Sequence, residues 1–340
     1  MKRRNFLAAA GASLFGIHAP AISAQGNGIV MTVNGPISPE KIGVTLTHEH
    51  VLVDFIGAEQ VNPDRYDAEE AFKVILPYLR QVRNLGCQSF IECTPAYIGR
   101  DVKLLQRLSQ AAGMHILTNT GYYGAANDKF VPKHAYEESA GQLAERWLDE
   151  WREGIEETGI RPGFIKIGVD SGPLSDIDAK LARAAALACK QSGLPIASHT
   201  GDTRAGLEQV EILQEEGVDP TSFIWVHAQN DWQLMRRIES AVMGVWISID
   251  NVNTNNSDAI IKKIMDMKAA GCLNKILLSH DAGWYSPGEP NGGDFRAFDA
   301  LFTNLIPSMK ETGFTQQEID QLLIHNPQHA FTIDAKTSGL

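Results

Sequence analysis

The segment Gly43-Val-Thr-Leu-Thr-His-Glu-His50 is an apolar run that ends in two histidines separated by one residue. Side chains alternate between the two faces of a strand, so a strand here would place His48 and His50 on one face and Glu49 on the other, towards the helices. Imidazoles are common metal ligands and an unusual filler for an apolar interior. The pair alone is weak evidence, because ten histidines in 340 residues give about 0.3 such pairs by chance.

The same arrangement recurs along the chain: a short apolar run, a polar or glycine-containing turn, and a longer segment with helical periodicity. Eight such alternations predict a single-domain (β/α)8 barrel over residues 25–340, which they fit better than a doubly wound sheet. The apolar runs lie near residues 43–52, 87–94, 114–120, 163–169, 195–200, 222–228, 244–250 and 275–281, and the helical segments near 68–85, 102–112, 137–158, 177–192, 205–216, 232–242, 258–270 and 295–311.

Four polar residues stand in or at the end of later apolar runs. His199, His227 and Asp281 each close a run, and Lys166 lies inside one. Barrel enzymes place their chemistry at the C-terminal ends of the strands, so we expect these residues to meet the first histidine pair there. Taken singly, each also fits a hydrogen-bonded core histidine, a lysine at the barrel rim or a helix-capping aspartate. Their agreement on one end of the barrel favours a functional site.

The order and spacing of these motifs resemble those of the phosphotriesterase family within the amidohydrolase superfamily, from about Gly35 to Phe331. The resemblance implies a (β/α)8 barrel with two divalent metal ions, usually zinc. It also implies that the lysine reacts with CO2 to form a carbamate, which would supply negative charge and two oxygens where an ammonium would repel the cations. The implied ligands are His48, His50 and Asp281 for the more buried ion, His199 and His227 for the more exposed ion, and the carbamate of Lys166 between them.

The resemblance further implies a hydrolase in which a hydroxide shared by the two ions attacks an ester and Asp281 accepts its proton. Tyr123 matches a tyrosine that lactonases of the family place against this hydroxide. His280, next to Asp281, should point the opposite way and receives no ligand role.

Two positions depart from the family pattern. Asn251 follows Asp250 where the organophosphate hydrolases of the family have histidine and its lactonases have arginine. Asn230 replaces an aspartate that continues the proton relay. Because an asparagine carries no proton at neutral pH, the relay beyond Asp281 is not predicted.

Aromatic residues near the strand ends bear on the substrate. They either line an apolar pocket or pack their own loops; Arg204 is the nearest candidate for binding an anion and fits a surface residue equally well. A neutral carboxylic ester or lactone is therefore the first choice, with an organophosphate triester as the alternative. The long Gly/Pro loop at residues 283–294 fits either a substrate lid or a plain connection. The aromatic residues concerned are Tyr122, Tyr123, Trp284 and Tyr285.

Two other classes of function remain open. One-metal deaminases on related barrels also begin with a His-x-His strand, but they usually carry a catalytic glutamate and have no metal-bridging lysine, so Lys166 argues against them. A barrel that binds metal or ligand in the periplasm without turnover is the non-enzymatic alternative. Turnover of esters by the metal-loaded protein distinguishes these readings.

Composition and the first residues indicate partners and location. A formal net charge of −11 and a pI near 5.4 argue against nucleic acid and anionic membranes as partners. Lys2, Arg3 and Arg4 precede a small apolar stretch that resembles a twin-arginine export signal over residues 1–24, which predicts a periplasmic protein with no membrane association after signal removal. The four cysteines are expected to be free thiols, and the family resemblance makes a homodimer an expectation.

Overall fold

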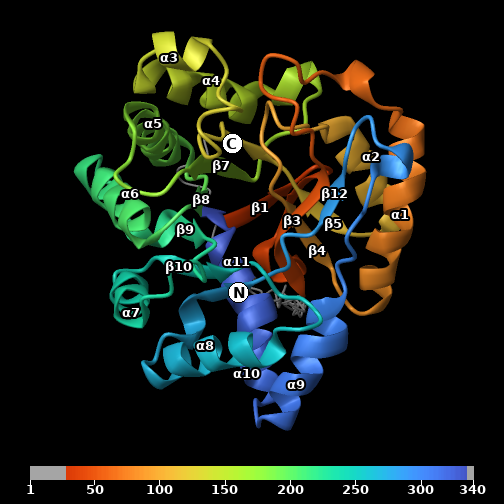
Figure 1. The fold of residues 1–340 in the computed structure, drawn as a ribbon, viewed down its shortest axis with the longest axis vertical. Helices are drawn as coiled ribbons and strands as arrows, with labels where there is room; N and C mark the ends of the chain where they lie inside the picture. Colours follow the sequence, from red (N-terminus) through yellow and green to blue (C-terminus); the bar gives the residue numbers. More distant parts are fainter. Residues whose placement is uncertain (1–27, 335–340) are drawn as a thin grey trace, which may run out of the picture.

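The strands of the molecule gather at its centre and the helices surround them, as the computed structural model of residues 28–334 shows (Figure 1). β3, β4 and β5 pair in parallel, and so do β6 to β11 in chain order; β5 and β6 are two parts of one run, interrupted at Thr118. The α/β fold with parallel strands is thus confirmed, whereas the predicted export signal lies outside the described residues. The strands are β3 (Thr45–Leu52), β4 (Ser89–Glu92), β5 (His115–Leu117), β6 (Asn119–Thr120), β7 (Phe164–Val169), β8 (Ile196–Thr200), β9 (Phe223–Val226), β10 (Trp246–Ile249) and β11 (Ile276–Leu278).

The first and last strands of this series meet through side chains. The Thr47 hydroxyl donates to the carbonyl of Leu278 at 3.2 Å, and the backbone N–H of His48 donates to the Ser279 hydroxyl at 2.9 Å. Towards the C-terminal end of β3, backbone pairing resumes, because β12 (Gly283–Tyr285) lies parallel to β3. We call the junction of residues 45–50 with residues 276–282 the seam.

The main helices follow the predicted segments and begin at polar caps such as Asp67, Asp101 and Ser175. Two predicted helices were too long. A capping box at Ser139 starts a new helix inside the segment 137–158, and the backbone of Arg296 pairs with Gly283, so no helix begins at residue 295. The helices are α1 (Ala68–Asn84), α2 (Val102–Ala112), α3 (His134–Glu137), α4 (Ala140–Glu153), α5 (Asp176–Ser192), α6 (Thr203–Glu215), α7 (Leu234–Val242), α8 (Ser257–Ala269), α9 (Ile306–Glu311), α10 (Gln316–Asp320) and α11 (Asn326–Ala330).

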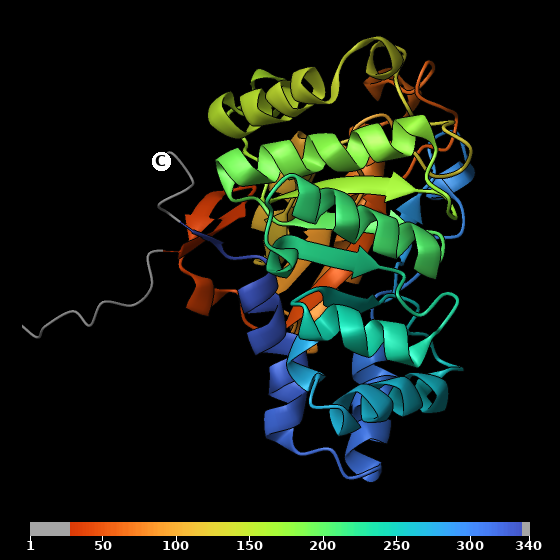
Figure 2. The same ribbon diagram turned by 90° about the vertical axis from the view of Figure 1, so that its left-hand side faces the viewer.

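A small antiparallel sheet at one end of the molecule was not predicted from the sequence. It consists of β1 (Gly28–Thr32), β2 (Gly35–Ile37) and β13 (Ile333–Asp334). Figure 2 shows β1 and β2 in red beside the ends of the central strands. Their pairing joins segments far apart in the sequence, which short-range periodicity does not reveal.

Apolar side chains fill two layers. One lies between the strands and the helices and includes Leu46, Phe90 and Ile75; the other lies inside the ring of strands and includes Phe164 and Ile224. All four cysteines are buried and unpaired, as predicted. No helix in residues 28–334 has the length and apolar character needed to cross a membrane.

Candidate metal centre

A register shift in β3 orients the first histidine pair. Leu46 belongs to the apolar layer that faces the helices, and regular alternation would send His48 to that same side. β3 instead gains one residue relative to β4 between Leu46 and Glu49. This bulge reverses the alternation, so His48 and His50 point into the ring of strands and Glu49 points out.

Donor atoms of three predicted ligands converge at the C-terminal end of the ring. The Nε2 atoms of His48 and His50 lie 3.2 Å apart. Asp281 Oδ1 lies 3.1 Å from Nε2 of His50 and 3.9 Å from Nε2 of His48. On its far side, Nδ1 of His50 meets the Thr94 hydroxyl at 2.8 Å. Each ring thus presents its Nε2 atom to one shared point.

The other two histidines lie next to this group, and the ring centroids of His48 and His227 are 5.0 Å apart. Asp281 Oδ2 is 3.8 Å from Nε2 of His227, and the rings of His199 and His227 have centroids 4.5 Å apart. His227 and Asp281 both have left-handed backbones, with φ of 59° and 56°. Such a conformation costs a non-glycine residue roughly 1–3 kcal/mol and persists where surrounding contacts hold it, often at functional sites.

Lys166 is a buried cation, 2% exposed, in the middle of β7. Its Nζ donates to the carbonyl of Ile167 at 3.3 Å and lies 5.5 Å from the centroid of the Tyr123 ring. Burial lowers the pKa of Lys166, which favours the neutral amine. The same burial raises the pKa of Tyr123, so its hydroxyl keeps its proton at neutral pH.

One cavity of about 120 Å³ brings the six candidate metal ligands and Tyr123 together. Its floor is polar and its rim is apolar and aromatic. Phe55, 46% exposed, is a large apolar side chain at this rim and contacts the Trp284 ring edge-on. The lining residues are His48, His50, Lys166, His199, His227, Asp281 and Tyr123, together with Val53, Phe55, Cys93, Pro95, Ile98 and Trp284.

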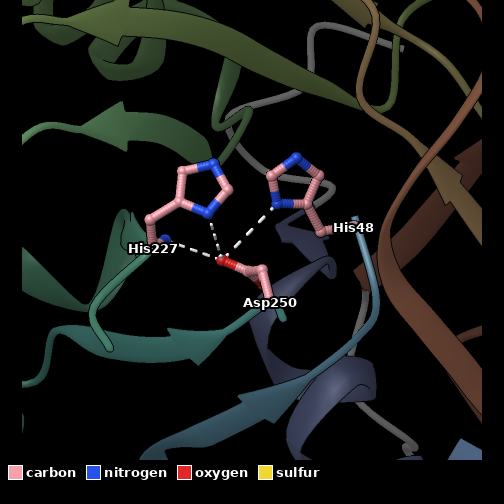
Figure 3. Close-up of side chains that lie close together, drawn as sticks. All are labelled: His48, His227 and Asp250. Carbon is pink, nitrogen blue, oxygen red and sulfur yellow. Dashed lines mark hydrogen bonds and ion pairs between the residues drawn. The ribbon is translucent and has the colours of Figure 1, made fainter. Parts of the chain in front are cut away.

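Asp250 lies behind two of the histidines (Figure 3). Its Oδ2 atom is 3.5 Å from Nδ1 of His48 and 3.6 Å from Nδ1 of His227, and it accepts the backbone N–H of His227 at 2.6 Å. Asp250 is fully buried, and the neighbouring His48 and His227 outweigh burial and lower its pKa. A carboxylate on the Nδ1 side fixes the proton there and leaves Nε2 as the ligand atom, a common second layer around bound metals.

We expect Asp250→Asn to weaken zinc binding about 10- to 100-fold, because an amide offers less charge to the two Nδ1–H groups. Isothermal titration of the metal-free protein measures the affinity. Asp258→Asn, the same change at an exposed position of α8, is the control and should leave the affinity unchanged. Equal affinities for both variants would contradict a supporting role for Asp250.

The donor set fits divalent cations. Burial, followed by the adjacent His48, lowers the pKa of His227 to about 4, and burial lowers the pKa of His50 and His199 as well. For Asp281, the hydrogen bond with His50 and the nearby imidazoles overcome burial and hold the pKa low. At neutral pH the site therefore offers neutral imidazoles and an ionised carboxylate, the forms that bind zinc. Two groups of potential donors in residues 28–334 are close enough to hold an ion: His48, His50 and Asp281, and His48, His227 and Asp250. In the second group Asp250 faces the Nδ1 atoms, so it fits the supporting role described above better than that of a ligand.

Comparison with known proteins agrees with this geometry. The model of the phosphotriesterase family matches residues 28–331. The chain belongs to the phosphotriesterase family.

The sequence identity between this chain and its relatives is low, but each alignment covers nearly the whole length of the relative. A phosphotriesterase homology protein of Escherichia coli is 31% identical over 87% of this chain and 100% of its own. An aryldialkylphosphatase of Saccharolobus solfataricus is 27% identical over 87% of this chain and 97% of its own. A solved mutant of a phosphotriesterase-like lactonase from Deinococcus radiodurans superposes with a TM-score of 0.79 at 26% identity, over 89% of this chain and 99% of that one. The chain is therefore a phosphotriesterase-like hydrolase.

In this phosphotriesterase-family chain, Glu49 and His280 are structural. Glu49 accepts the Ser279 hydroxyl at 2.7 Å, the His280 Nδ1–H at 2.6 Å and the backbone N–H of Ala282 at 2.9 Å. His280 Nε2 accepts the backbone N–H of Leu301 at 2.9 Å. His280 thus points away from Asp281, as predicted, and Glu49 holds the outer side of the seam together.

The structure distinguishes between the alternatives that the sequence left open for two of the aromatic residues. Tyr122 packs against Trp147 and His134, and the Tyr285 hydroxyl donates to Glu70 at 3.2 Å, so both tyrosines lie outside the cavity lining. Residues 283–285 form β12, so the predicted Gly/Pro loop is partly strand.

Polar residues near the mouth also have local roles. Arg204 pairs with Glu208 on the surface of α6. Asn251 is exposed and its carbonyl accepts from Asn253 and Asn256. The backbone N–H of Asn230 donates to the carbonyl of His227 at 2.9 Å. These contacts give Asn230 and Asn251, the two positions where the family pattern changes, local roles in their own loops.

Proposed function

We propose that the chain is a binuclear-metal-dependent hydrolase of a neutral carboxylic ester or lactone. The observation that carries this proposal is the 120 Å³ cavity in which four histidines, Lys166 and Asp281 lie beneath an apolar rim. Sites of this shape, with a few converging polar groups inside an apolar surround, are typical of small-molecule enzymes.

His48, His50 and Asp281 would hold the more buried ion, and His199 and His227 the more exposed one. Two such ions acidify water and polarise the bond to be broken. Asp250 and the Thr94 hydroxyl keep the first-strand histidines turned with Nε2 inward. The low pKa of Asp281 keeps it ionised at neutral pH, and its carboxylate lies near imidazoles of both groups, so it can accept the proton that the attacking water loses.

Lys166 would join the two metal positions as a carbamate. Its neutral amine adds to the carbon of CO2, the new N–C bond forms, and the amine nitrogen loses one proton to give an anionic –NH–CO2⁻ group. Burial favours the neutral amine that this reaction needs. Tyr123 keeps its phenolic proton and lies beside His199, with ring centroids 5.1 Å apart, so it would donate a hydrogen bond to the reacting group.

The rim supports a neutral substrate. Val53, Phe55, Ile98 and Trp284 contribute apolar or aromatic surface, and Lys166, which the site itself uses, is the only Arg or Lys among the described lining residues. Apart from the metal ions, an anionic substrate would therefore find no cationic side chain among these lining residues to bind it. An organophosphate triester is the second candidate, because it is also neutral and because a relative is named aryldialkylphosphatase.

The experiment is turnover by the zinc-loaded protein on matched aryl esters, lactones and phosphotriesters. We expect ester or lactone hydrolysis that a chelator abolishes and zinc restores, since the cations supply the nucleophile. Faster turnover of the phosphotriesters would favour the second candidate. Inactivity on the whole panel, with two ions bound, would overturn the hydrolytic proposal in favour of a binding barrel.

We also propose export to the periplasm by the twin-arginine route, supported by Arg3, Arg4 and the apolar stretch that follows. Fractionation of cells expressing the full chain tests this: Arg3→Lys with Arg4→Lys should retain the protein in the cytoplasm.

A further inference from the structure

Arg237 is a buried cation outside the metal-centre cavity. It stands on α7, is 0% exposed, and stacks with its Cζ 4.1 Å from the centroid of the Trp225 ring. In residues 28–334 its guanidinium forms no direct ion pair; burial lowers its pKa, and the more distant carboxylates of Asp231 and Asp202 only partly oppose this. Burying a charge without a direct partner is expensive. The contacts of Arg237 explain why it is buried.

Its contacts are backbone carbonyls of a single loop. Nε donates to Ala228 at 2.8 Å, and Nη2 donates to Asn230 at 3.0 Å and to Asp231 at 3.3 Å. These residues directly follow His227, whose left-handed backbone turns the chain out of β9. The guanidinium is a rigid planar fork, so its N–H groups hold these carbonyls in fixed directions, whereas the ammonium of a lysine would have to reach them from a single atom. Arg237 thus fixes the loop that sets the direction of the His227 ring.

The same loop is joined to the loop that follows His199. The Thr203 hydroxyl donates to the carbonyl of Asp231 at 3.0 Å, and the backbone N–H of Thr203 donates to the Asp231 carboxylate at 3.4 Å. Thr203 begins α6, three residues after the end of β8, which carries His199. Arg237 and Thr203 therefore both donate to the carbonyl of Asp231, and Thr203 follows the strand that carries His199.

We propose that Arg237 is a positioning residue that holds His227, and through Asp231 and Thr203 also His199, as the ligand pair of the more exposed ion. This rests on the metal centre of the proposed function. It predicts that the two metal positions respond differently to Arg237, because the contacts reach the loops of His199 and His227 and do not involve the β3 histidines.

The test is stepwise titration of the metal-free protein with Co²⁺, followed by visible absorption and calorimetry. In Arg237→Met we expect the second equivalent to bind about 10- to 100-fold more weakly, the range for lost support behind metal ligands, and the first equivalent to bind as in the wild type. Arg237→Lys should lie between the two. Arg236→Met, one residue away on α7 and with its side chain 53% exposed, is the control and should titrate as the wild type.

Circular dichroism of the metal-free variants shows whether they fold, and so distinguishes a loss of ligand positioning from a loss of the fold. If Arg237→Met does not fold, the titration of Arg237→Lys decides the question. Two equivalents bound with wild-type affinities in the folded variant, or equal weakening of both, would overturn the proposal. A wild type that binds two ions and hydrolyses nothing would overturn the proposed function while leaving the role of Arg237 intact.

Discussion

Replacing Lys166 with methionine is expected to reduce hydrolysis at least about 1000-fold, equivalent to about 4 kcal/mol of transition-state stabilisation. Methionine has a similar length and suits the buried site, so the fold should survive. It has no amine to react with CO2 and cannot supply an anionic ligand between the two metal positions. Without that ligand the cations repel each other, and the second ion should be lost.

The measurement combines kcat/KM with metal content at neutral pH. Lys103→Met, the same change at an exposed position of α2, is the control and should retain wild-type activity. Activation of the metal-free wild type by zinc should be faster in bicarbonate than in CO2-depleted buffer, and this difference should vanish in Lys166→Met. Full activity of Lys166→Met with two ions bound would rule out the carbamate.

Asp281→Asn is the second change with a large expected effect, a loss of about 10²- to 10⁴-fold in kcat, the usual range for a general acid or base. The amide has nearly the same shape as the carboxylate but accepts no proton at neutral pH. The hydrogen bond with His50 and the nearby imidazoles keep the pKa of Asp281 low in spite of burial, so the native side chain is ionised throughout the neutral range. The variant removes both this charge and the proton acceptor.

Metal content separates the two roles of Asp281. A variant that keeps two ions but loses kcat has lost the proton acceptor, whereas a variant with fewer ions has lost a ligand. Asp294→Asn, at an exposed position of the following loop, should leave both quantities unchanged. Retention of more than a tenth of the native kcat would show that another group accepts the proton.

The convergence of the candidate ligands could be predicted from the sequence because each of them stands in or at the end of an apolar run, and parallel strands bring such residues to one end of a ring. Asp250 ends an apolar run in the same way as Asp281. The sequence did not reveal its role, because that role depends on the side of β10 to which its carboxylate points. The orientation of the first histidine pair was predicted correctly, although regular alternation from Leu46 would have given the opposite face. The bulge in β3 turns the two histidines to the inner face. A bulge arises from the pairing of β3 with β4, which the sequence of β3 alone does not reveal.

The remaining residues belong to contacts between distant segments. In the sequence, Arg237 resembles an ordinary surface residue of an amphipathic helix. In the structure, the loop after β9 covers it and accepts its hydrogen bonds. Tyr122 and Tyr123 are neighbours with aromatic rings, and only the packing of Tyr122 against Trp147 shows which of them faces the cavity. Aromatic side chains suit either setting, so the sequence pattern could not separate them.

A metal ion bound at the seam would also have a structural role. His48 and His50 stand on the first strand of the ring and Asp281 follows the last one, while the lower part of this junction relies on side chains such as Thr47. An ion bound by all three residues would cross-link β3, the first strand of the ring, to the segment that follows β11, the last one. A ligand that binds only the folded chain stabilises it by mass action. We therefore expect the metal-free protein to be less stable and its seam to open locally more often, with the pairing of β12 and the contacts of Glu49 still joining the two sides.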